Sequence, residues 1–146
     1  MELFDQDMVG DPSYGQKMND LVFESGVRVL TKDFNANTVT FYLKGNKRRI
    51  NWLMDRLQAN YTNADIRVEK MAMVSAIGSD MKVPGLLKSA ASALSDAGVN
   101  ILSVHQAMRQ VDMMFIVADQ DYAAAVKALH TSLIENNSDW EAVQSA

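Results

Sequence analysis

The stretch SAIGSDMKVPGLLKSAASALSDAGVNILSVHQ, residues 75–106, decides the fold. It opens inside a nearly continuous apolar run that predicts a buried strand over Met71–Ile77. After a loop containing glycine and proline, the sequence predicts a helix over Leu86–Ala97, which Gly98 ends. A second strand is expected over Asn100–Gln106. Apolar residues at helical spacing mark the inner face of the helix; they are Leu87, Ala90, Ala91 and Leu94.

The same design occurs earlier in the chain, so the protein is a tandem repeat of one small unit. Like residues recur 72 or 73 positions apart in the two halves. These are Asp7-Met8 with Asp80-Met81, Pro12 with Pro84, and Gly26-Val27 with Gly98-Val99.

Hydrophobic periodicity and turn residues give the full order of elements. In the first unit we expect strands over Glu2–Met8, Val27–Thr31, Thr38–Leu43 and Ile66–Lys70, with helices over Gln16–Ser25 and Lys47–Asn60. In the second we expect strands over Met71–Ile77, Asn100–Gln106 and Met113–Ala118, with helices over Leu86–Ala97 and Tyr122–Asn136. The last helix should face inward with Val126, Leu129, Leu133 and Ile134.

This order predicts an α+β protein of two tandem ferredoxin-like βαββαβ units, at residues 1–70 and 71–146. Each unit should have an antiparallel four-stranded sheet with its helices on one face. The second unit lacks an obvious fourth strand, because residues 137–146 are polar and irregular. Its sheet edge would be open. Three candidates could supply the missing strand: a segment upstream of Met1, the tail around Trp140–Val143, or a second chain. We expect at least a homodimer.

Composition excludes several functions. The 146 residues are 48% apolar, which is enough for a core, and the net charge of −4 argues against binding nucleic acid or an anionic membrane. There is no cysteine and there are two histidines, which excludes thiolate chemistry and disfavours a metal site. No apolar run reaches the ~20 residues of a membrane span. We expect a cytoplasmic protein. Because a predicted strand begins almost directly after Met1, we also expect the chain to be a piece of a longer protein.

The sequence offers no catalytic constellation. Asp5, Asp7 and Asp11 cluster, but we interpret them as a solvated loop, since an acid–base pair needs a cleft that separates the two pKa values. The basic run Lys47–Arg49 is interpreted as a solvated helix end. An RNA binder on this fold would need a basic sheet with exposed aromatic residues. An acyl-phosphate hydrolase would need an arginine in a first-strand loop to bind phosphate. The sequence provides neither feature.

One feature in each unit suggests a binding site. A loop containing glycine and proline leaves the first strand and enters a helix, which presents backbone amides and partial positive charge to a carboxylate or phosphate. The alternative is that these residues simply make a tight turn.

These loops carry a family resemblance. The second unit resembles the second ACT domain of aspartokinases in its Gly-x-x-Met loop, Pro-Gly helix start, Gly-Val-Asn-Ile strand entry and Ala-Leu-His helix end. The residues are Gly78, Met81, Pro84, Gly85, Gly98–Ile101 and Ala128–His130. The first unit resembles the first ACT domain through QDMVGDPSYGQKMNDLVFESGVRVLTKDFNANT, residues 6–38.

The resemblance implies a regulatory fragment of an aspartokinase, the enzyme that phosphorylates L-aspartate with ATP. It implies an amino-acid effector such as lysine, threonine or a related metabolite. ATP and Mg²⁺ would bind a catalytic domain outside this chain, which itself would hold no cofactor. Asn35-Ala36-Asn37 is similar to the ectoine-associated type of the family. The alternatives are a purely structural dimerisation module and a stand-alone ACT protein that regulates another enzyme.

The resemblance also assigns effector-binding positions. In the first unit they are Met8, Asp11, Tyr14, Gly15, Val29 and Leu30; in the second they are Asp80, Met81, Val83, Pro84, Gly85, Asn100 and Ile101. Amides near Tyr14, Gly15 and Gly85 would hold an α-carboxylate, and Asp11 or Asn100 would accept from an ammonium group. Lysine- and threonine-sensitive members usually carry a Thr-Ser-Glu or Ser-Ser-Glu stretch after the second strand of the unit. This chain has residues 33–37 and 108–111 there, which favours either weak regulation or a different metabolite.

Overall fold

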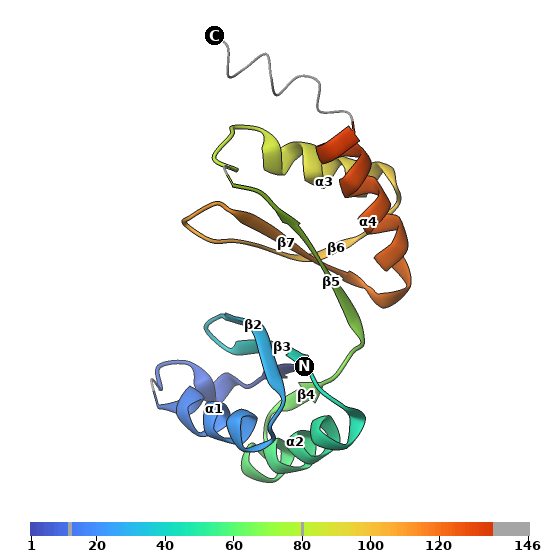
Figure 1. The fold of residues 1–146 in the computed structure, drawn as a ribbon. Helices are drawn as coiled ribbons and strands as arrows, with labels where there is room; N and C mark the ends of the chain where they lie inside the picture. The colour runs from blue at the N-terminus through green and yellow to red at the C-terminus, as the bar shows by residue number, and fades with distance from the viewer. Residues whose placement is uncertain (12, 80, 136–146) are drawn as a thin grey trace. The chain divides into compact units, whose positions relative to one another are not determined.

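The computed structural model describes residues 1–11, 13–79 and 81–135. The chain folds as two compact units, Met1–Glu69 and Lys70–Ala146 (Figure 1). Each unit has its own sheet and its own hydrophobic core. The two are therefore described separately.

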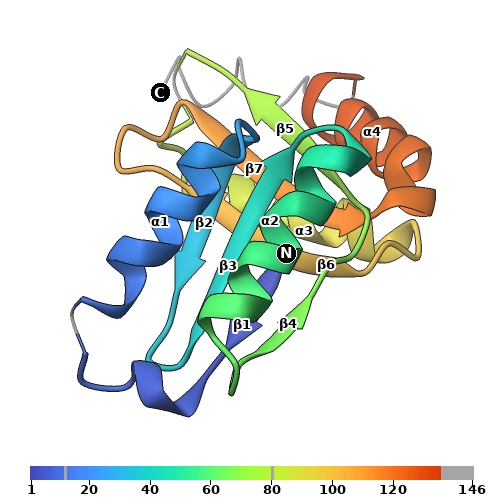
Figure 2. The same cartoon turned by 90° about the horizontal axis from the view of Figure 1, so that it is seen from below.

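The first unit is a four-stranded antiparallel sheet covered on one face by two helices (Figure 2). Its strand order is β2-β3-β1-β4, with the short first strand between the third and the fourth. The elements are β1 (Glu2–Phe4), α1 (Tyr14–Glu24), β2 (Arg28–Phe34), β3 (Thr38–Lys44), α2 (Lys47–Asn60) and β4 (Asp65–Arg67). The predicted ferredoxin-like arrangement is confirmed for this unit.

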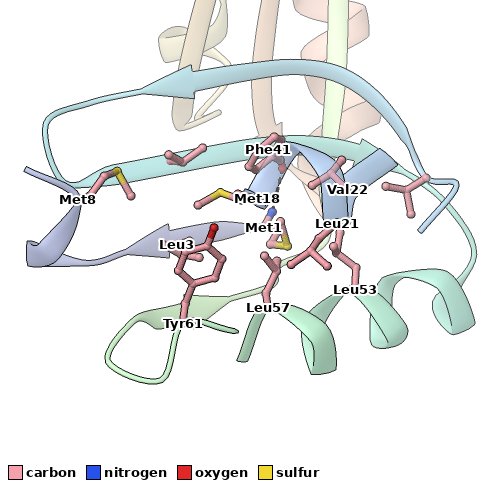
Figure 3. Packing of buried hydrophobic residues seen from close by; sticks show 12 residues of the cluster. Met1, Leu3, Met8, Met18, Leu21, Val22, Phe41, Leu53, Leu57 and Tyr61 are labelled. Atoms are coloured by element: carbon pink, nitrogen blue, oxygen red, sulfur yellow. Dashed lines mark hydrogen bonds between the residues drawn. The ribbon is translucent and has the colours of Figure 1, made fainter. Parts of the chain in front are cut away.

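The core of the first unit lies between the sheet and both helices (Figure 3). Alternate residues of the strands point inward, and residues three or four apart do so on the helices, as these two periodicities require. The strands supply Leu3, Val39 and Phe41, while the helices supply Met18, Leu21, Val22, Leu53 and Leu57.

Two polar contacts set the ends of these helices. The Asn46 side chain accepts a hydrogen bond from the Arg49 amide, 3.0 Å away, and so caps the start of α2. Arg49 Nη1 donates to the Gly26 carbonyl at 2.7 Å, next to the C-terminal end of α1. The sequence predicts that Lys47–Arg49 is only a solvated helix end. Arg49 instead joins the start of α2 to the end of α1 through its bond to Gly26.

The second unit repeats the arrangement with three strands in order β5-β7-β6, all antiparallel. Its elements are β5 (Met71–Ile77), α3 (Leu86–Asp96), β6 (Ile101–Gln106), β7 (Asp112–Ala118) and α4 (Tyr122–His130). One π-helical turn over Thr131–Glu135 continues α4. The core contains Phe115 from the central strand and Leu94 and Leu129 from the helices.

The inner faces of α3 and α4 differ from the predicted ones. Leu86, the first residue of α3, is buried and starts the inner stripe, which leaves Leu87 39% exposed. In the last helix Leu129 and Leu133 face inward as predicted, but Val126 is 39% and Ile134 65% exposed. Ala125 takes the inner position instead of Val126, and Ile134 lies within the π-helical turn.

The described residues of the second unit form three strands, and β5 is at one edge of the sheet. In the first unit the equivalent strand, β1, has β4 beside it at that position. The predicted helix residue Asn136 and the candidate strand Trp140–Val143 lie outside the described residues. None of the described helices is both long and apolar enough to cross a membrane.

Candidate functional site

The first loop, defined as the residues between β1 and α1, is a series of tight turns. β1 ends at Phe4 rather than Met8, because the Asp5 side chain accepts from the Asp7 amide at 2.9 Å and turns the chain into one 3₁₀ turn. The amides of Met8, Asp11 and Tyr14 each donate to the carbonyl three residues before them, all at 3.3 Å. Met8 is buried and anchors the loop in the core.

Asp11 is an exposed acidic residue of this loop, as Asp7 is. Its Oδ1 accepts two hydrogen bonds from Ser13, from the backbone amide at 2.8 Å and from the hydroxyl at 2.6 Å. These bonds hold the pKa of the Asp11 carboxyl below its usual value. Asp11 is therefore a fixed negative charge at the start of α1, and it suits an ammonium group.

The Asp11 carboxyl should titrate below its ordinary pKa of 3.8. Since its folded pKa is depressed, the contribution of the Ser13 bonds is present above pH about 4 and is lost as the pH falls through the folded pKa. A side-chain NMR titration of the 146-residue chain measures this. Ser13→Ala should raise the Asp11 pKa, whereas Ser89→Ala, at an exposed serine of α3, should leave it unchanged. An unchanged pKa in Ser13→Ala would contradict this assignment.

The other predicted residues of the first unit lie in two places. Gly15 is in the first turn of α1, and a Cβ added there would meet Phe34 Cε2 at 3.8 Å. Val29 and Leu30 are each 41% exposed on β2, where the register with β3 shifts between Val29 and Thr31. Val29 lines a hollow of about 550 Å³ between α1 and β2, together with residues such as Asn19, Phe23, Lys32 and Phe41.

Polar side chains hold the first loop in roles that the sequence analysis did not predict. Asp5, expected in a solvated loop, is 5% exposed, and its Oδ2 accepts a hydrogen bond from the Tyr14 hydroxyl. The Tyr61 hydroxyl in turn donates to the Tyr14 carbonyl at 3.0 Å. An Asp-x-Asp at a strand end is the one local signal, since aspartate there often bonds a backbone amide two residues on.

The second loop, between β5 and α3, is held by backbone bonds. The amides of Gly78 and Met81 donate to the carbonyls of Val111 and Gln110, at 2.9 and 3.1 Å, in the β6–β7 connection. Gly85 caps α3 with φ of 90°, a left-handed conformation that favours glycine. The Gly78 and Met81 amides are thus engaged by backbone carbonyls, as the Tyr14 amide of the first loop is.

The predicted residues of the second unit lie in this loop and at the start of β6. Met81 is buried, Val83 and Ile101 are half-buried, and Pro84, Gly85 and Asn100 are exposed; Asp80 lies outside the described residues. A hollow of about 570 Å³ lies between β5 and α4. Of the predicted second-unit residues that the structure describes, Met81 alone lines it, beside Ile77, Tyr122, Leu129 and His130.

Comparisons with known proteins identify the family. A family model of the ACT domain matches residues 74–133. The aspartate kinase Ask_Ect of Stutzerimonas stutzeri (strain A1501) is 40% identical over all 146 residues of this chain. The chain spans 31% of the length of that curated relative.

Two solved structures share the fold. The ligand-free regulatory subunit of aspartate kinase from Thermus thermophilus has a TM-score of 0.73 at 19% identity, with 90% of each chain covered. Aspartokinase III of E. coli in complex with lysine and aspartate, in the T-state, also gives 0.73 at 19% identity and covers 91% of this chain and 30% of that one. At this identity they show the fold alone. The chain therefore carries an ACT domain at residues 74–133, and over its whole length it is homologous to part of an aspartate kinase.

Proposed function

We propose that this chain is the effector-binding regulatory region of an aspartate kinase and that the first loop binds an amino acid. One observation carries the proposal: the ionised Asp11 stands beside the start of the 11-residue helix α1. A carboxylate suits an α-ammonium group, and the partial positive charge of a helix N-terminus suits an α-carboxylate. The loop therefore offers both charges that a zwitterion needs.

The relatives support the rest of the assignment. The 40% identity to the S. stutzeri kinase supports an aspartate kinase as the intact enzyme, which would phosphorylate L-aspartate in the cytoplasm. ATP and Mg²⁺ would bind a catalytic domain outside this chain, and the chain would hold no cofactor of its own. The lysine complex of the E. coli relative supports an amino acid such as lysine, threonine or a related metabolite as the effector.

Regulation by such a site requires two arrangements of the enzyme with different affinities for the effector. Coupling of the effector site to the kinase would be on the order of 1–3 kcal/mol, typical of allostery. We propose a homodimer as the assembly in which these arrangements differ, because paired ACT units provide an interface that a ligand can bias.

A structural dimerisation module is the second candidate function. The outer edge of β5 has no partner strand among the described residues, and an apolar hollow lies beside it. An open edge of this kind accepts a strand from another segment or chain. In this alternative the chain associates without any effector.

Calorimetric titration of the 146-residue chain with lysine, threonine, methionine and ectoine tests the proposal. We expect saturable heat with at least one of them, and Asp11→Asn should weaken that affinity by about fivefold, as for one exposed ion pair. Asp20→Asn, at an exposed aspartate of α1, is the matched control and should bind as the wild type does.

The same samples separate the two candidates. Absence of heat with all four compounds, together with a dimer that persists in analytical ultracentrifugation, would favour the structural module. Equal weakening by Asp11→Asn and Asp20→Asn would show a general charge effect and would remove Asp11 from the site.

A further inference from the structure

Three hydrogen-bonded side chains, Asp5, Tyr14 and Tyr61, link the first loop to neighbouring elements, and we name them the Asp5 cluster. We propose that Asp5 and Tyr61 are positioning residues, which act through Tyr14 to hold the first loop in its ligand-binding shape. The proposal rests on the function proposed above, since it assigns residues that prepare the same site.

Asp5 fixes the beginning of the loop. The carboxylate is nearly fully buried, and both of its oxygens are used, Oδ1 by the Asp7 amide at 2.9 Å and Oδ2 by the Tyr14 hydroxyl. The Asp5 amide donates to the Asn37 carbonyl at 2.9 Å, so the backbone here is also tied to the β2–β3 connection. A buried carboxylate stays in place only while such donors are present, because burying it without them is costly.

Tyr61 fixes the end of the loop. It caps the C-terminus of α2, is 9% exposed, and its hydroxyl donates to the Tyr14 carbonyl at 3.0 Å. The two tyrosine rings pack with their centroids 4.9 Å apart. Burial, followed by the bond to Asp5, raises the pKa of Tyr14, so this hydroxyl remains a donor throughout the neutral range. Tyr14 is thereby held from both sides, by the end of β1 and by the end of α2.

The tandem repeat provides an internal comparison. Gly78 follows β5 as Asp5 follows β1, and both amides make the equivalent bond to the facing hairpin. Leu86 begins α3 as Tyr14 begins α1, and the buried Leu133 follows Leu129 as Tyr61 follows Leu57. The second unit therefore builds the same corner with a glycine and two leucines. The fold does not require the polar groups of the Asp5 cluster, which points to a role specific to the first loop.

A pre-shaped loop raises affinity because the ordering cost is met before the ligand arrives. The shape of the first loop is defined by turn hydrogen bonds. Their donors are the backbone amides of Met8, Asp11 and Tyr14. If the Asp5 cluster holds the loop, removing one of its hydrogen bonds should let these amides open more often.

Hydrogen exchange and calorimetry on the 146-residue chain test this in parallel. The variants Asp5→Asn, Tyr14→Phe and Tyr61→Phe each remove one polar function with almost no change in shape. We expect exchange at the amides of Met8, Asp11 and Tyr14 to rise by about tenfold, as for loss of one hydrogen bond. Effector affinity in Tyr14→Phe and Tyr61→Phe should fall by a similar factor. Tyr122→Phe, at a half-exposed tyrosine of α4, is the matched control, and exchange at the Gly78 and Met81 amides should be unchanged in all variants.

Each outcome has a defined meaning. Unchanged exchange at the first loop in all three variants would overturn the role of the Asp5 cluster, whatever the ligand. Faster exchange with wild-type effector affinity would overturn the positioning role. If the wild type binds none of the four compounds, the proposed function fails instead, and the exchange data still decide whether these side chains hold the loop.

Discussion

Replacing Phe115 with alanine is expected to lower the free energy of unfolding of the second unit by about 3–5 kcal/mol. Phe115 is fully buried in the central strand β7, between β5 and β6, and contacts the core beneath both helices. Truncation removes the whole aromatic ring and leaves a cavity that a sheet with helices on it cannot readily close. Urea unfolding followed by far-UV circular dichroism measures the loss.

The control is a phenylalanine at the surface of a strand. Phe34 on β2 is 62% exposed, so Phe34→Ala should change stability by no more than about 1 kcal/mol. Hydrogen exchange should locate the effect of Phe115→Ala in residues 71–135. Comparable losses in the two variants would contradict the burial assigned to Phe115.

Replacing Leu53 with alanine is expected to lower the free energy of unfolding of the first unit by about 2–5 kcal/mol. Leu53 is fully buried on α2 and packs among Leu21, Leu57 and Phe41 (Figure 3). Loss of this side chain should also loosen the end of α2, where Tyr61 reaches the first loop. Thermal unfolding and hydrogen exchange of residues 1–69 measure both effects.

Leu87→Ala is the matched control for this change. Leu87 is also a helical leucine, and its spacing predicts an inward position, but it is 39% exposed. We expect a loss of about 1 kcal/mol or less there. A loss at Leu87 equal to that at Leu53 would show that the predicted face of α3, rather than the observed one, is correct.

Local signals in the sequence were sufficient for most of the fold. The bounds of α2, Lys47–Asn60, and of β5, Met71–Ile77, agree with the predicted ranges because a strong apolar period and clear end residues define them. The end of α4 was not predictable in this way. The structure forms a π-helical turn over Thr131–Glu135, and within it Leu133 is buried while Ile134 is 65% exposed.

The candidate site was predictable in part. The two loops could be located from their glycine, proline and methionine residues, and Asp11 is exposed at the loop as its assigned role needs. The burial of Asp5 could not be foreseen, because it depends on Tyr14 and Tyr61, and Tyr61 is 47 positions from the tyrosine it contacts. The use of the second-loop amides by Gln110 and Val111 is likewise a long-range contact that no local pattern encodes.

An NMR map of ligand-induced shifts on the 146-residue chain tests the central claim most directly. Amide spectra would be recorded during titration with whichever of the four compounds gives calorimetric heat, and with each of them if none does. We expect the largest shift changes at Asp11, Tyr14 and Gly15, with smaller ones at Val29 and Leu30. Changes confined to other surfaces, or none at millimolar concentrations of every compound, would contradict an amino-acid site at the first loop.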